Sequence, residues 1–234
     1  MELNTYPLVC TRGVVLYPNQ EIVIDVGRDT SVHAVENAQD NYDKKICLFS
    51  QKELEQENPA TEDIYSVGTL CEIRHIRRFD NFLRVKFRGI KRVKLNKWIN
   101  GSLSDLVEVE IHESEKQDAV EEEALIRMIA DELDRMQGQD RFVTKEIVME
   151  ISKGMGGEFL SDKAVQGLPL DIERKQQYLE TLGVNDRLMM LLQDMAKEKK
   201  MSEVEQQINE TVKERIDQGQ KDYYLREKMN VIRE

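Results

Sequence analysis

The spacing of apolar residues changes once along this chain, near residue 113, and that change limits the folds open to it. Before it, apolar and polar residues alternate, so that Leu83, Val85 and Phe87 share one side of a run whose other side is basic. After it, apolar residues recur every three or four positions, as at Leu125 and Ile129. A period of two is typical of a strand with one solvated face, and a period near 3.6 of an amphipathic helix. The sequence therefore predicts an α+β protein.

The first part, residues 1–113, is predicted to be a β-rich subdomain. Several short alternating runs are separated by turn residues, and the run 21–27 ends at Gly27. One amphipathic helix interrupts them at residues 31–40. Because strands with one wet face favour an antiparallel sheet, we expect a partly open β-barrel or two packed sheets.

The second part is predicted to be helical. Residues 114–185 hold three amphipathic stretches bounded by glycines and are expected to form a helical bundle. From 186 to 234 only Gly219 weakens a further helix pattern. At 1.5 Å per residue this last helix is roughly 70 Å long. Its end must pack on something absent from this chain, pair with another chain, or extend into solvent.

Composition narrows the class of protein. With 40% hydrophobic and 34% charged residues, the chain has the composition of a soluble, folded protein. Its apolar runs are too short to span a bilayer, and its first residues lack the basic start and apolar core of a secretion signal. Cys10, Cys47 and Cys71 lie in or beside apolar stretches without CxxC spacing, so we expect buried, reduced thiols and a cytoplasmic location.

A basic stretch, Arg74–Trp98, offers an alternative function. It holds ten Lys and Arg residues against one acidic residue, with aromatic residues interleaved. Such a face could bind the phosphates of a nucleic acid. However, the solvated face of a half-exposed sheet is ordinarily charged, and the net charge of −11 argues against nucleic-acid binding over the whole surface. We favour the ordinary solvated face. The residues of the alternative nucleic-acid face are Arg84, Lys86, Arg88, Arg92 and Lys94.

No catalytic constellation is evident. His33, His75 and His112 are isolated, without a second ligand at metal-binding spacing. The glycine-rich run 152–159 lacks the Lys-Ser/Thr pair of a phosphate-binding loop, and neither GxSxG nor HExxH occurs. We expect this chain to have no catalytic residue, no cofactor and no metal site.

Several stretches together resemble the ATP-dependent protease Lon. Near its start the chain has the family's order of features, a first strand with Leu8 followed by Arg12-Gly13, Tyr17-Pro18 and Gly27-Arg28 before the first helix. Residues 221–234 are similar to the segment just before the family's ATPase module. The stretches that continue the match are 67–76, 85–95 and 168–198.

The resemblance implies a PUA-like β subdomain, a helical bundle and a long helix leading to the ATPase. The family's enzyme is a homohexameric, cytosolic, ATP-driven serine protease that degrades misfolded and short-lived regulatory proteins and uses ATP and Mg²⁺. Its Walker motifs and Ser-Lys dyad are expected beyond residue 234. The resemblance thus implies a non-catalytic region for substrate recognition and oligomerisation. Its expected partners are unfolded or degron-bearing proteins and other Lon subunits.

Two stretches are candidate contact surfaces. If Leu16, Tyr17 and Pro18 form a loop tip, they make an exposed apolar patch that could capture unfolded chains. The alternative is a buried strand that ends in an ordinary turn. In the long helix, Ile208, Val212 and Ile216 could pair with a neighbouring subunit. Their spacing of four departs from a heptad, so a long regular coiled coil is not expected.

Overall fold

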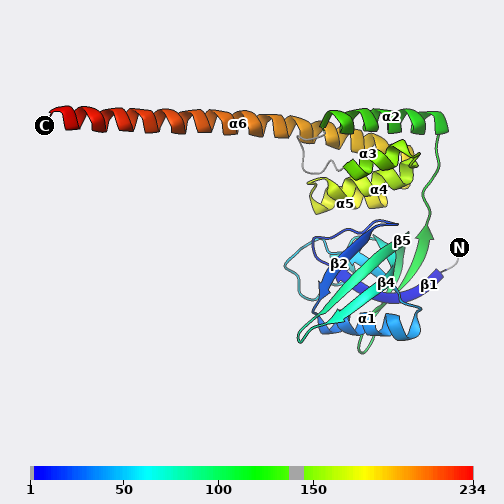
Figure 1. Ribbon diagram of the computed structural model, residues 1–234. Helices are drawn as coiled ribbons and strands as arrows, with labels where there is room; N and C mark the ends of the chain where they lie inside the picture. The colour runs from blue at the N-terminus through cyan, green and yellow to red at the C-terminus, as the bar shows by residue number, and fades with distance from the viewer. Residues whose placement is uncertain (1–2, 137–144, 234) are drawn as a thin grey trace.

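The computed structural model of the protein describes residues 3–136 and 145–233, which form a sheet-rich part, a helical part and a projecting helix (Figure 1). The predicted α+β class is confirmed. The strands are β1 (Leu3–Thr11), β2 (Glu21–Val26), β3 (Lys45–Ser50), β4 (Val67–Arg78), β5 (Leu83–Ile99) and β6 (Leu106–His112). The helices are α1 (Asp29–Asn41), the short 3-10 helix η1 (Thr61–Asp63), α2 (Ala119–Met136), α3 (Lys145–Ser152), α4 (Gly157–Gly167), α5 (Ile172–Glu180) and α6 (Val184–Arg233).

Five of the strands close into a small barrel. The strand order is β2-β5-β4-β3-β1-β6, and β6 closes the ring by pairing with the second half of β5. The first half of β5 pairs instead with β2, from Glu21 opposite Arg88 to Val26 opposite Leu83. β2 is therefore a strand attached to the ring at one edge only, within the described residues.

The barrel core follows the alternation seen in the sequence. Val85 and Phe87 of β5 are fully buried, whereas Arg84, on the opposite face of the same strand, is exposed. α1 lies against one end of the barrel (Figure 1) and contributes Ala34 and Val35 to the same core. The predicted wet and dry faces are correct for this half of β5.

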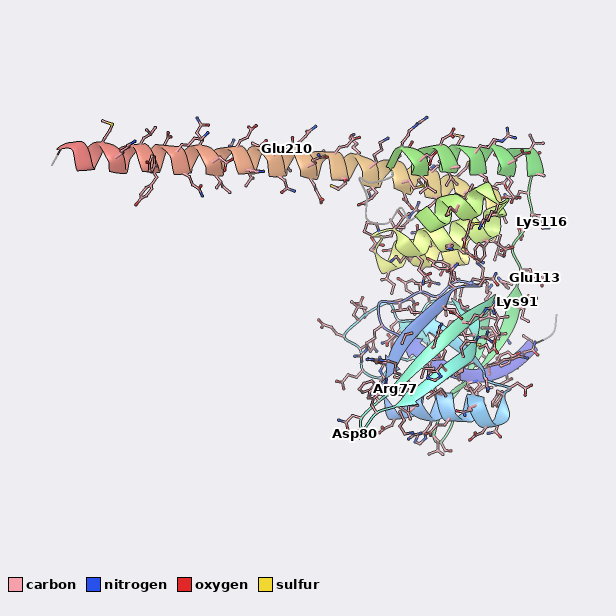
Figure 2. The ribbon with its side chains drawn as sticks, in the orientation of Figure 1. Arg77, Asp80, Lys91, Glu113, Lys116 and Glu210 are labelled. Carbon is pink, nitrogen blue, oxygen red and sulfur yellow. The ribbon has the colours of Figure 1, made fainter. Side chains whose placement is uncertain are left out.

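The helical part is built around the first third of α6. Leu188 and Leu191 of α6 are fully buried and pack with Leu125 and Ile129 of α2. From about residue 200 the helix leaves the body and is exposed, as Figure 2 shows at Glu210. At 1.5 Å per residue the whole of α6 is about 75 Å long.

α6 begins earlier than the predicted residue 186. Asn185 is buried in its first turn, and its side-chain amide donates to the carbonyl oxygen of Asp118 (3.0 Å) and to the carboxylate of Glu121 (2.8 Å). These bonds tie the start of α6 to the start of α2, so the helix starts at Val184.

None of the helices within the described residues has an apolar stretch long enough to cross a membrane.

Candidate functional site

The segment predicted to be an exposed loop tip is buried. Leu16 is 4% exposed and Tyr17 is 0% exposed, and Pro18 is buried with them. The segment lies between the barrel and the helices, and successive side chains enter different cores: Leu16 enters the barrel core, whereas Val15 and Tyr17 enter the helical core. The prediction of an exposed substrate-contact patch at Leu16, Tyr17 and Pro18 is therefore wrong, and the buried alternative is correct.

Hydrogen bonds and a glycine hold this segment against β5. Gly89 donates its N–H to the carbonyl of Gln20 and accepts from the N–H of Asn19, both at 2.9 Å. A Cβ at position 89 would lie 2.2 Å from the carbonyl oxygen of Tyr17, so only glycine permits this approach. The Tyr17 hydroxyl donates to the carbonyl of Lys175 in α5 (2.7 Å). The segment is thus a joint between the two parts.

The basic face proposed for nucleic acid is largely neutralised. Arg84 donates two hydrogen bonds to Asp25, at 2.7 and 2.8 Å, and the Lys86 ammonium lies 2.7 Å from the Glu21 carboxylate. Paired charges of opposite sign leave little field for phosphates. The remaining exposed members of the predicted set are Arg88 and Lys94.

Arg92, the fifth member of that set, is buried at the joint and is 1% exposed. Its guanidinium lies 2.5 Å from the carboxylate of Asp162 in α4, and its Nε donates to the carbonyl of Leu179 in α5 (3.1 Å). Arg187 of α6, also fully buried, lies 3.9 Å from the same carboxylate oxygen. Burial and the neighbouring Arg92 charge lower the pKa of Arg187 to about 10. The prediction of a solvated Arg92 is wrong because α4 and α5 cover this part of β5.

The apolar stripe on α6 is exposed in the single chain. The exposed fractions of Ile208, Val212 and Ile216 are 56%, 48% and 54%. Each step of four residues turns the stripe by about 40° around the helix axis. A partner helix can therefore follow the stripe only over a short crossing. The pairing of these residues with a neighbour stays a prediction.

A groove lies where strand pairing stops on the barrel wall. β1 pairs with β6 only from Leu3 to Pro7, and on its other edge with β3 from Leu8 to Thr11. A pocket of about 380 Å³ separates this second half of β1 from β2. It is lined by residues 9–12, residues 24–28 and Ser31 of α1.

The groove has an apolar lining and a positively charged end. Val9 and Val26 are 3% exposed, and Ile24 is half-buried beside them. Arg12 donates to the carbonyl of Gln56 (3.0 Å) and Arg28 to the side-chain oxygen of Gln51 (2.5 Å). Neither arginine forms an ion pair within the described residues.

The two arginines at the groove also affect each other. Partial burial and the nearby Arg12 charge both lower the pKa of Arg28. A guanidinium keeps its charge at neutral pH even so. Glu57 acts in the opposite direction on Arg28 but forms no ion pair with it in the described structure. The end of the groove therefore carries two positive charges that are not held in ion pairs, and an anionic group bound there would be stabilised.

Sequence reasoning missed this groove. The Arg12-Gly13 and Gly27-Arg28 steps were available as a signal, since three of these residues line it. In the sequence these two pairs only mark the order of features that resembles the family. Their proximity depends on where the pairing of β1 with β6 ends, and no local pattern shows that.

The groove has the features of a binding surface. Burial raises the pKa of the Cys10 thiol to about 12, so this thiol is protonated at neutral pH and is a poor nucleophile. In the part of the chain that the structure describes, no three His, Cys, Asp or Glu side chains gather as metal ligands would. The groove does offer strand edges, an apolar lining and the positive charges of Arg12 and Arg28, which are features that could bind another molecule.

Comparison with known proteins relates this arrangement to one family. A family model described as the ATP-dependent protease La (LON) substrate-binding domain matches residues 5–197. The chain is 32% identical over 227 residues to Lon protease from Brevibacillus choshinensis and 33% identical over 231 residues to Lon protease 1 from Bacillus subtilis. These matches cover 97% and 98% of the chain, but only 29% and 30% of the relatives.

Solved structures show the same fold. The N-terminal domain of Mycobacterium avium complex Lon protease superimposes with a TM-score of 0.67 at 20% identity, covering 82% of this chain and 98% of that one. A Lon N-terminal domain protein from Xanthomonas campestris gives a TM-score of 0.57 at 16% identity, covering 81% and 97%. The resemblance found in the sequence is confirmed. With a family model that extends over residues 5–197, the chain belongs to the LON substrate-binding domain family.

Proposed function

We propose that this chain recognises protein substrates for an ATP-dependent serine protease of the Lon type and has no catalytic activity of its own. The description of the family model and the names of the relatives support this. The chain spans about 30% of the length of the curated relatives. In this proposal, ATP and Mg²⁺ act in other domains of a cytoplasmic homohexamer, whose substrates are misfolded and short-lived regulatory proteins.

The observation that carries the proposal is the groove between β1 and β2. An unfolded polypeptide offers apolar side chains and unpaired main-chain groups, and the groove offers an apolar lining beside strand edges. A contact of this size is weak, but several copies in one ring raise the effective concentration at the entrance. α6 extends from the body and supplies a connection to the rest of such an enzyme (Figure 1).

The purified chain is expected to bind a reduced, carboxymethylated protein that cannot refold, with a Kd of about 10–100 μM. The native, disulfide-bonded form of the same protein is the matched control and should bind at least about tenfold more weakly, because its apolar segments are buried. Fluorescence anisotropy measures both. Equal binding of the two forms would contradict recognition of unfolded segments.

Salt separates this function from the nucleic-acid alternative. Binding to phosphates weakens steeply with salt, in proportion to the phosphates neutralised, whereas apolar binding is maintained. Tight, salt-sensitive binding of duplex DNA with no binding of the unfolded protein would replace the proposed function by that alternative.

The projecting part of α6 is proposed to pair with the same segment of a neighbouring subunit. Ile208 and Ile216 expose more than half of their surface. Large apolar side chains aligned on an exposed helix are typical of a surface that another protein covers. Changing both to Glu should abolish self-association of the chain, measured by light scattering over a concentration series. A matched control, Gln207→Glu with Lys221→Gln, makes the same change in net charge on the opposite side of the helix. A chain that is monomeric at all concentrations would refute the pairing.

A further inference from the structure

β2 has a free edge, and its register shows which main-chain groups face that edge. The N–H of Gly89 in β5 donates to the carbonyl of Gln20 (2.9 Å), so the carbonyl of residue 20 faces β5. In an antiparallel pair, alternate residues point their main-chain groups to opposite edges. The N–H and C=O groups of Glu21, Val23 and Asp25 therefore point away from β5, where no described strand pairs with them.

The opposite wall of the groove is also a strand edge. On the β6 side of β1, the N–H of Leu8 donates to the carbonyl of Asp105 (3.0 Å), one residue beyond the last pair with β6. Two residues farther on, the main-chain groups of Cys10 face the same side. The groove thus lies between the free edge of β2 and the edge of β1 beyond Leu8, and neither edge pairs with a described strand there. Its volume of about 380 Å³ falls within the range of ordinary ligand sites.

The charge and polarity of the groove limit its occupant. Ile24 and Val9 provide apolar surface along it, so apolar side chains on one face of an extended segment suit it. Arg12 and Arg28 form no ion pair in the described structure, so a negatively charged group on the occupant would be stabilised at that end. An Asp or Glu side chain, or a chain's terminal carboxylate, supplies such a group.

We infer that an extended, apolar segment of a protein substrate adds to β2 as a further strand, with a carboxylate beside Arg12 and Arg28. This inference rests on the proposed function and specifies its site and the bound form of the substrate. Strand addition uses main-chain groups, which every unfolded polypeptide carries, so it permits recognition of many sequences. The carboxylate fixes the position of the segment along the edge.

The main-chain part is tested with a fluorescent peptide of about ten residues, long enough for one strand. The peptide alternates Val and Thr and carries one Asp after the alternation. Val23→Pro removes an N–H from the free edge without removing a bond to β5, and it should weaken peptide binding about tenfold or more. Val23→Thr keeps both the N–H and the β-branched shape and should bind within about twofold of the original chain.

The charge part is tested by reversal. Arg12 is exposed and bonds only to a main-chain carbonyl, so Arg12→Glu should leave the fold intact. It should weaken binding of the Asp peptide about tenfold and bind the corresponding Lys peptide better than the unchanged chain does. Arg127→Glu is the matched control, because Arg127 lies on α2 in the helical part and is 75% exposed. It should alter neither affinity.

Amide hydrogen exchange gives a readout that requires no variant. On peptide binding, exchange should slow at Val23 and Asp25, whose N–H groups face the free edge, and stay unchanged at Ile22 and Ile24, which already bond to β5. If the chain binds the unfolded protein but neither exchange nor the Val23 and Arg12 variants respond, strand addition is wrong and the proposed function stands. If it binds neither the unfolded protein nor the peptide, the proposed function itself fails.

Discussion

Replacing Asp162 by Ala is expected to lower the free energy of unfolding by about 3–5 kcal/mol. Asp162 is 2% exposed and lies 2.5 Å from Arg92 and 3.9 Å from Arg187, both of which are fully buried. Burial raises the pKa of the Asp162 carboxyl, and the Arg92 guanidinium opposes that rise. Without this carboxylate, two guanidiniums remain in the protein interior with no opposing charge nearby that is equally buried.

Urea unfolding followed by circular dichroism measures the loss. Asp25→Ala is the matched control, because it also removes a carboxylate that binds an arginine, Arg84, but both side chains are about half exposed. That change should cost far less than Asp162→Ala does, because exposed ion pairs contribute little to stability. Equal losses in the two variants would show that the Arg92 network does not stabilise the joint.

The local elements of this fold were predictable because each is determined by its own pattern. The alternation in β5 predicts which residues lie on its inner and outer faces correctly. The recurrence of Leu188, Leu191 and Met195 identified the buried side of α6. The spacing of apolar residues indicates which residues share a face of a helix or strand, and it can be read from the residues of that element alone.

The partner of each face was not predictable. Arg92 does lie on the outer face of β5, as the alternation indicates, but α4 and α5 cover that face, and Asp162 is 70 residues away in the chain. Likewise, Tyr17 follows an apolar run that fits a buried strand or an exposed tip equally well. The groove depends on the residue at which β1 changes partners, which is a property of the assembled sheet. Charge and polarity in a single sequence do not distinguish water from a second layer of the same protein.

Replacing Tyr17 by Ala is expected to cost about 3–5 kcal/mol of stability, because a fully buried aromatic side chain is lost from the helical core. Tyr17→Phe is the matched control. It keeps the ring and removes only the hydrogen bond to the carbonyl of Lys175, which should cost about 1 kcal/mol. The joint therefore depends mainly on packing and only secondarily on this bond.

The same pair of variants distinguishes a joint from a substrate contact. If Tyr17 touched substrates, Tyr17→Ala would weaken binding of the unfolded protein while leaving unfolding unchanged. A buried joint requires the reverse: the variant unfolds at lower urea, and binding per folded molecule stays within about twofold, since the groove at Val9 and Ile24 lies on a different part of the barrel wall. Binding measured well below the urea midpoint of each variant separates the two cases. If Tyr17→Ala lost binding without losing stability, the substrate would contact Tyr17 itself, and the site proposed beside β2 would be wrong.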